Sequence, residues 1–173
     1  MTEHRYSLVL SIYVTTRGFA FTLFEGPFAP VDWGITEKRG LLRNRRCLGA
    51  IERLLQRYRP SALVLQDTSE RGTVRTKRIR KLNRAVRELA DGNAIAVFVF
   101  SRAQVREYFA SFSVPTKQGI AEAIAKHVPA FERYLPPVRR AWMSEDSRMG
   151  LFDAAALILT FFHSIASTAA AVR

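Results

Sequence analysis

The hydrophobic pattern of the chain changes its period once, and this change restricts the possible folds more than any other feature. Before it, three apolar or alternating runs cover 7–14, 19–24 and 31–40, separated by the turn segments TTRG and EGP. Such a pattern is typical of an antiparallel meander of strands. After it, apolar residues recur every three to four positions in 43–59, which predicts an amphipathic helix. The short apolar run 61–67 then predicts a fourth strand.

Helices and strands continue to alternate in the remaining sequence. A second helix is predicted to end at Gly92, and a fifth strand to occupy 94–100. Ser101 followed by Gln104 has the pattern of a capping box and predicts a helix to about Phe109. Three further segments complete the prediction: a helix opened by Pro115 and Thr116 that reaches about Val128, a proline-bearing loop over 129–142, and a final helix capped by Ser144 that reaches about Ile165.

This order of elements predicts an α/β fold with a mixed five-stranded sheet flanked by helices. Three strands form the antiparallel meander, and the two later strands lie parallel to the first through right-handed crossovers. With 173 residues and no evident linker, the chain fits one domain. We expect a single domain over 1–166 and a short C-terminal tail over 167–173.

The composition favours a polyanionic partner. The formal net charge is +12, which predicts attraction to nucleic acid first and to an anionic membrane surface second. The single cysteine excludes an internal disulfide framework and a zinc site of several cysteines. The apolar run AAALILTFF near the C-terminus is too short to span a bilayer, so we expect a soluble, cytoplasmic protein without a membrane partner.

A dense basic segment covers 71–87, with eight basic residues and no acid. Ile79, Leu82 and Val86 have the spacing of a buried helix face, which leaves the charges on other faces. Like charges so dense repel one another unless a polyanion neutralises them, and this favours contact with DNA phosphates rather than base reading. The predicted DNA-binding residues are Arg71, Arg75, Lys77, Arg80, Lys81, Arg84 and Arg87, with Lys117, Lys126, Arg139 and Arg140 as weaker candidates.

Four stretches, in this order, resemble a known family: LSIYVTTRGFAFTLFEG, ALVLQD, SRAQVREYF and SEDSRMGLFDAAALIL. Together they resemble the RuvC-like Holliday-junction resolvases of the ribonuclease H-like superfamily, over about residues 8 to 163. The resemblance implies a ribonuclease H-like fold, branched DNA as a partner, and a possible homodimer. It also implies two Mg²⁺ ions that act on a phosphodiester, held by acids on the first strand, at the end of the fourth strand and on the final helix.

Two of the positions implied by this resemblance carry no acid. Tyr13 stands on the first strand where the family pattern has aspartate, and Gln66 ends the fourth strand where it has glutamate. The final helix keeps Asp146 and Asp153, the candidate metal ligands, which a helix would place on one face. Gly150 between them would allow a strand or ligand to approach closely.

These replacements matter chemically. A phenol is neutral at pH 7 and an amide brings no charge, so the two-metal mechanism is expected to be lost or badly impaired. Asp67 is adjacent to Gln66, but neighbouring strand residues point to opposite faces. Asp153 has apolar neighbours, and we expect it to be at least half-buried and to face the end of the first strand.

Three hypotheses therefore remain, and whether the chain is an enzyme stays open among them. The first is a DNA-binding protein of RuvC-like fold with an impaired or absent metal site. The second is an active Mg²⁺-dependent junction endonuclease whose catalytic acids are rearranged around Asp67, Asp146 and Asp153. The third is a non-enzymatic adaptor whose basic face meets a protein partner.

Overall fold

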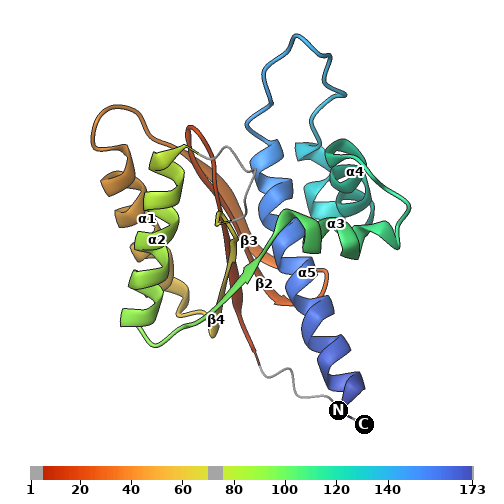
Figure 1. Cartoon of the computed structure of the whole chain (residues 1–173), viewed down its shortest axis with the longest axis horizontal. Coiled ribbons are helices and arrows are strands. Elements are labelled where there is room, and N and C mark those ends of the chain that lie inside the picture. Colours follow the sequence, from red (N-terminus) through yellow and green to blue (C-terminus); the bar gives the residue numbers. More distant parts are fainter. Residues whose placement is uncertain (1–5, 70–75, 173) are drawn as a thin grey trace.

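Residues 6–69 and 76–172 are described by a computed structural model, and they form one mixed sheet with helices on both faces (Figure 1). Most elements begin and end close to their predicted bounds. In chain order the elements are β1 (Val9–Val14), β2 (Gly18–Gly26), β3 (Ala29–Glu37), α1 (Arg43–Tyr58), β4 (Ala62–Gln66), α2 (Lys77–Gly92), β5 (Ala96–Phe100), α3 (Arg102–Ala110), α4 (Lys117–His127), the 3₁₀ helix η1 (Pro129–Tyr134) and α5 (Met149–Ala171).

The sheet has the strand order β3-β2-β1-β4-β5. β1 pairs with β2, and β2 with β3, in antiparallel orientation. β4 lies parallel to β1, and β5 lies parallel to β4. This confirms the predicted α/β fold with a three-stranded meander and two parallel strands. The central strands β1 and β4 are covered on both faces, which explains their nearly continuous apolar runs.

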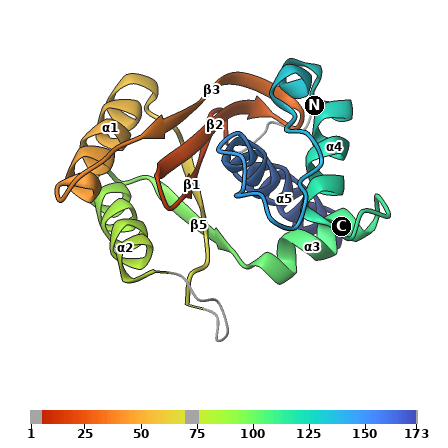
Figure 2. The same ribbon diagram turned by 90° about the horizontal axis from the view of Figure 1, so that it is seen from above.

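Helices cover the two faces of the sheet in separate groups. α1 and α2 lie on one face, whereas α3, α4 and α5 lie on the other (Figures 1 and 2). Side chains of β1 alternate between them: Leu10 and Ile12 join the apolar cluster under α1 and α2, and Val9 joins the cluster under α5. Buried Ser11 on the α5 side donates a hydrogen bond of 2.7 Å to the carbonyl oxygen of Ala154, which fixes α5 against β1.

Gly150 allows α5 to approach the sheet closely, as its place in the sequence suggested. A Cβ atom at this position would lie 3.0 Å from Cγ2 of Thr15 and 3.4 Å from Cβ of Ala20. A side chain here would therefore push the first turn of α5 away from β1 and β2. The beginning of α5 is held next to the carboxyl end of β1 by this contact.

The predicted start of the final helix was wrong. α5 begins at Met149, and its N-cap Arg148 makes no capping side-chain hydrogen bond, so Ser144 lies in the preceding loop. The carboxylate of Asp146 accepts hydrogen bonds from the backbone and the guanidinium of Arg148, which closes a turn before the helix. Two further boundaries differ: the 3₁₀ helix η1 occupies the start of the predicted 129–142 loop, and α5 continues to Ala171 with exposed last turns.

The length of α5 also exceeds what the run AAALILTFF suggested. Among the described residues, α5 is the one helix long and apolar enough to cross a membrane by length and composition. However, 72% of its most apolar window is buried inside the protein, because the helix packs along the sheet. This burial is typical of the central helix of an α/β domain.

Several elements meet at the edge of the sheet where β1, β4 and β5 end. Such an edge is where open α/β sheets place their ligands. Arg43 at the start of α1 donates a hydrogen bond of 2.7 Å to the carbonyl of Thr16, and Arg78 of α2 donates one of 2.6 Å to the carbonyl of Thr15. Both arginines thus tie the beginnings of these helices to the turn after β1.

Candidate functional site

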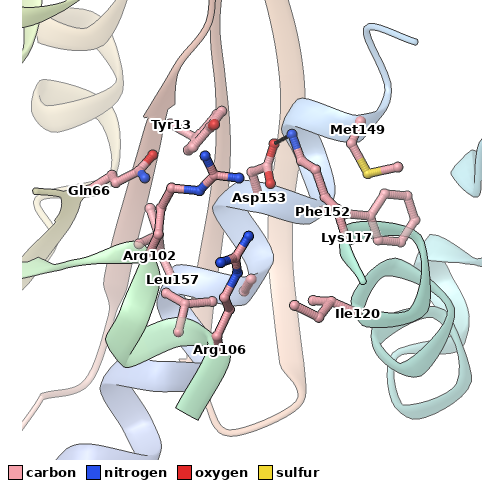
Figure 3. Close-up of a pocket in the computed structure, with 12 residues that line it drawn as sticks. Tyr13, Gln66, Arg102, Arg106, Lys117, Ile120, Met149, Phe152, Asp153 and Leu157 are labelled. Carbon is pink, nitrogen blue, oxygen red and sulfur yellow. Dashed lines mark ion pairs between the residues drawn. The ribbon is translucent and has the colours of Figure 1, made fainter. Parts of the chain in front are cut away.

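A pocket opens at this edge, between the ends of β1 and β4 and the helices α3, α4 and α5 (Figure 3). Tyr13 reaches it from β1, Gln66 from the last position of β4 and Asp153 from the second turn of α5. The Asp153 side chain is 18% exposed and lines the pocket together with Tyr13. The predicted position of Asp153, half-buried and close to the end of the first strand, is therefore confirmed.

A lysine ammonium occupies the space beside Asp153. Nζ of Lys117 lies 2.9 Å from Oδ2 of Asp153, and it also forms an ion pair with Glu145 (Figure 3 draws the first of these). The same Nζ lies 5.9 Å from the ring centroid of Tyr13. The Lys117 side chain is 37% exposed. A positive charge thus stands beside Asp153 and Tyr13, two of the four positions that the sequence resemblance associates with metal binding.

The position of Lys117 on its helix is electrostatically unusual. Lys117 is the first residue of α4, behind the capping residue Thr116, and a cation there opposes the helix dipole. Partial burial acts to lower the pKa of Lys117, but the negative charge of Asp153, the Tyr13 hydroxyl and hydrogen bonds to Glu145 and Asp153 raise it above the ordinary value. The carboxylates therefore account for a charge that the helix terminus alone would disfavour.

Two arginines extend the positive charge of the pocket. Arg102 and Arg106 are four residues apart on α3, so both lie on one face of that helix, and both line the pocket. Figure 3 shows their side chains reaching from α3 toward the space between Gln66 and Asp153. The capping box of Ser101 and Gln104 is present, as predicted, and fixes where α3 begins. The pocket lining carries three formal positive charges against one negative charge.

Asp146 reaches the site from a loop and not from the final helix. It precedes α5, so the prediction that Asp146 and Asp153 share one helical face was wrong. Both residues nevertheless line a second, adjacent pocket together with Tyr13 and Gly150. The hydrogen bond from the Arg148 side chain is the main cause that holds the pKa of Asp146 below its ordinary value.

Asp67 does not join the other two candidate acids. Its Oδ1 accepts hydrogen bonds from the backbone nitrogen of Ser69 at 2.8 Å and from its hydroxyl at 2.6 Å. The Ser69 hydroxyl is the main cause that lowers the pKa of Asp67. Asp67 lines neither of the two pockets. Within the described ranges, no three or more His, Cys, Asp or Glu side chains gather closely enough to hold a metal ion.

The donor atoms in the pocket do not suit a pair of Mg²⁺ ions. Mg²⁺ requires hard oxygen ligands, chiefly carboxylates, together with water. Tyr13 and Gln66 supply neutral oxygens, and the carboxylate of Asp153 is already paired with Lys117. The surplus positive charge of the lining also repels a divalent cation. The residues that line this pocket therefore do not fit the two-metal site that the sequence resemblance implies.

α2 presents its basic residues as the sequence predicted. Ile79, Leu82 and Val86 are buried in the cluster under α1 and α2. Arg71 and Arg75 lie outside the described residues. The remaining predicted DNA-binding residues are exposed on α2: Lys77, Arg80, Lys81, Arg84 and Arg87.

The pocket contains three cations whose role the sequence did not suggest clearly. Arg102 and Arg106 were not predicted at all, and Lys117 was only a weaker candidate for phosphate contact. One sequence signal was present, because Arg102 lies two residues after the end of the predicted fifth strand. The residue after a parallel strand lies at the same edge as the ends of its neighbours.

The chain is similar to known proteins in its structure, and the sequence comparisons found no match. No protein-family model and no curated protein sequence matches it. Thermus thermophilus RuvC, solved in complex with a Holliday junction substrate, has a TM-score of 0.64 and 18% identity, over 93% of this chain and 97% of that chain. The yeast mitochondrial Holliday junction resolvase Ydc2 has a TM-score of 0.60 and 13% identity, over 89% and 77%. The fowlpox virus Holliday junction resolvase has a TM-score of 0.54 and 11% identity, over 91% and 99%. The chain thus has the RuvC-like, ribonuclease H-like fold that its sequence predicted.

Proposed function

We propose that this protein, with its RuvC-like resolvase fold, binds branched DNA through phosphate contacts and does not cut it by a metal-dependent reaction. The observation that carries the proposal is the Lys117 ammonium, 2.9 Å from Asp153 in the pocket shared with Tyr13 and Gln66. At this place the mechanism implied by the sequence resemblance requires carboxylates that hold dications. The chain instead supplies its own positive charge.

This charge suits a phosphodiester. An arginine guanidinium presents parallel donors that match the oxygens of a phosphate, and a lysine ammonium adds a point charge. Arg102, Arg106 and Lys117 together can therefore seat a backbone phosphate at the sheet edge with no metal ion between protein and DNA. The exposed basic residues of α2 lie on the other face of the sheet from α3, α4 and α5, and they provide further phosphate contacts.

The preference for a branch is drawn from the structural comparison. Thermus thermophilus RuvC was solved with a Holliday junction substrate, and this chain shares its fold over 93% of its residues. We extend that ligand class to this protein because three basic residues line the pocket at the edge of the sheet, and because α2 begins at the same edge, where Arg78 bonds to the turn after β1.

The test compares a four-way junction with a linear duplex of matched sequence, each with EDTA and with Mg²⁺, by fluorescence anisotropy and by a denaturing gel. We expect tighter binding to the junction, equal affinity with and without the metal, and no nicking. Affinity that does not fall with salt would instead support the adaptor hypothesis, because phosphate contacts release counterions. Robust Mg²⁺-dependent nicking, abolished by Asp67→Asn, would establish the rearranged endonuclease and overturn the proposal.

A repair series tests the role of Lys117 separately. Tyr13→Asp with Gln66→Glu restores two carboxylates, but the ammonium still pairs with Asp153 and competes with a metal ion. We therefore expect measurable Mn²⁺ binding by calorimetry only when Lys117→Met is added to that pair of substitutions. Tight Mn²⁺ binding by the unmodified protein would contradict the proposal.

A further inference from the structure

A long loop rises from the rim of the site and exposes large apolar side chains. We call residues 135–148, between η1 and α5, the Trp142 loop; it extends away from the rest of the molecule above α5 (Figure 1). Trp142 is 77% exposed, Val138 is 72% exposed and Met143 is 46% exposed. A tryptophan is usually largely buried, and Trp142 is not. We therefore expect a binding partner to cover its ring.

The tip of this loop is an ordered turn. The backbone nitrogen of Met143 donates a hydrogen bond of 3.0 Å to the carbonyl of Arg140, and the Arg139 guanidinium donates one to the carbonyl of Met143. The Arg140 guanidinium lies 5.4 Å from the centre of the Trp142 ring. The indole is therefore presented on a closed turn with a cation on its face, an arrangement stabilised by cation–π attraction.

The end of the loop nearest α5 is fastened to the pockets. Glu145 forms an ion pair with Lys117, which lines the first pocket, and Asp146, bound by Arg148 of the same loop, lines the second. Between 135 and 144 the loop carries two arginines and no acid. A ligand that follows the phosphate-binding edge can thus reach the Trp142 ring without meeting a negative charge on that part of the loop.

We infer that Trp142 is a stacking platform for an unpaired nucleobase, with Arg139 and Arg140 against the adjoining phosphates. The inference rests on the proposed function, since a branch point is where a duplex exposes unstacked bases. An aromatic ring stacks on any base, and flanking arginines supply both phosphate contact and cation–π attraction. A protein-docking patch would be broader and less charged than Val138, Trp142 and Met143 with two arginines among them.

The experiment uses the full chain with Trp142→Ala, Trp142→Phe and Arg139→Ala/Arg140→Ala. The matched control is Arg53→Ala/Arg57→Ala, which removes the same charge from exposed positions in the C-terminal half of α1. The probes are a four-way junction with 2-aminopurine at the branch point, its linear duplex and a single-stranded oligonucleotide. Trp142 is exposed, so Trp142→Ala should keep the melting temperature and circular dichroism of the parent protein.

We expect Trp142→Ala to weaken binding to the junction and to the single strand by about tenfold, and to leave duplex affinity unchanged. Trp142→Phe should retain most of the affinity, and quenching of 2-aminopurine should disappear with Trp142→Ala. Equal affinity of Trp142→Ala and the parent protein for all three DNAs would overturn the inference. If the parent protein shows no junction preference, the proposed branch recognition fails, whereas the single-stranded arm still decides whether Trp142 stacks on a base.

Discussion

At the scale of single residues, the site has lost two of the carboxylates that the resemblance implies and has gained a lysine ammonium. Tyr13 and Gln66 replace the acids that the sequence resemblance implies on β1 and β4, and Lys117 provides a cation against Asp153, one of the two acids that are kept. A half-buried carboxylate is costly without a positive partner. The lysine can thus preserve the arrangement of β1, α4 and α5 in the absence of a metal ion.

The ion pair predicts coupled effects on stability. Lys117→Met should lower the free energy of unfolding by about 1 kcal/mol, a small value because the ammonium is 37% exposed and solvent screens it. Asp153→Asn should cost a similar amount, and the double variant should cost less than the sum. Urea unfolding of the four proteins measures this coupling, with Lys126→Met, an exposed residue of the same helix, as the control. Additive single effects would contradict the pairing.

The same pair gives stability a defined dependence on pH. The folded protein holds the pKa of Lys117 above its ordinary value of 10.5, although partial burial acts in the opposite direction. A raised pKa means that the contribution is fully present below pH 10.5 and is lost as pH rises through the folded value. The stability difference between the parent protein and Lys117→Met should therefore be constant near neutral pH and should shrink in alkaline solution.

At the scale of elements, helical periodicity separates the buried residues of α2 from its exposed basic residues. Its apolar face packs under the sheet, and Asn83 donates a hydrogen bond of 3.2 Å to the carbonyl of Gln66. Arg78 faces inward as well, where it bonds to the turn after β1, and burial is the main cause that lowers its pKa. Among the described residues, the exposed basic residues of α2 make no comparable hydrogen bond to the backbone, and we propose that they contact phosphates.

Removal of charge from α2 should therefore weaken DNA binding without loss of the fold. Arg80→Ala/Arg84→Ala/Arg87→Ala should lower affinity for all sequences alike and reduce the slope of log K against log salt by roughly 2 to 3. The control Arg53→Ala/Arg57→Ala/Lys126→Ala removes the same charge from the distal halves of α1 and α4. Anisotropy titrations between about 50 and 200 mM salt measure both slopes. Equal slopes for the two triple variants would exclude α2 as the phosphate-binding element.

At the scale of the whole molecule, one sheet joins two apolar clusters. The first lies under α1 and α2, and the second lies between the sheet and α3, α4, η1 and α5. Because the same strands contribute side chains to both, we expect the chain to unfold as a single cooperative unit. This expectation tests the prediction of one domain over 1–166.

Substitutions on the two faces should shift one common transition. Ile51→Ala on α1 and Ile124→Ala on α4 remove fully buried side chains, and each should cost about 2 to 5 kcal/mol. Calorimetry should show a single transition in every case, with equal calorimetric and van't Hoff enthalpies. Truncation after Ala166 should leave the melting temperature unchanged, because the last turns of α5 are exposed. Two separately shifted transitions would contradict a single domain.

The sequence by itself determined the order, the type and much of the pairing of the elements. Hydrophobic period and turn residues act locally, so the meander, the amphipathic helices and the capping box at Ser101 were all predictable. The resemblance of the sequence to a known family also placed Tyr13 and Gln66 near the ends of β1 and β4. A local signal failed where one distant and one local charge pair competed with it. Ser144 and the acids after it have the pattern of a helix start, but Glu145 pairs with Lys117 and Asp146 with Arg148.

Only the tertiary structure decided which cations enter the pocket. Lys117 and Asp153 come from different helices, and Tyr13 lies more than a hundred residues before both, so no sequence period links the three. Their contact exists because α5 packs closely on β1 at Gly150 and α4 packs on α5. Packing distances of a few ångströms decide whether a carboxylate meets an ammonium or water, and these distances depend on the whole fold rather than on neighbouring residues.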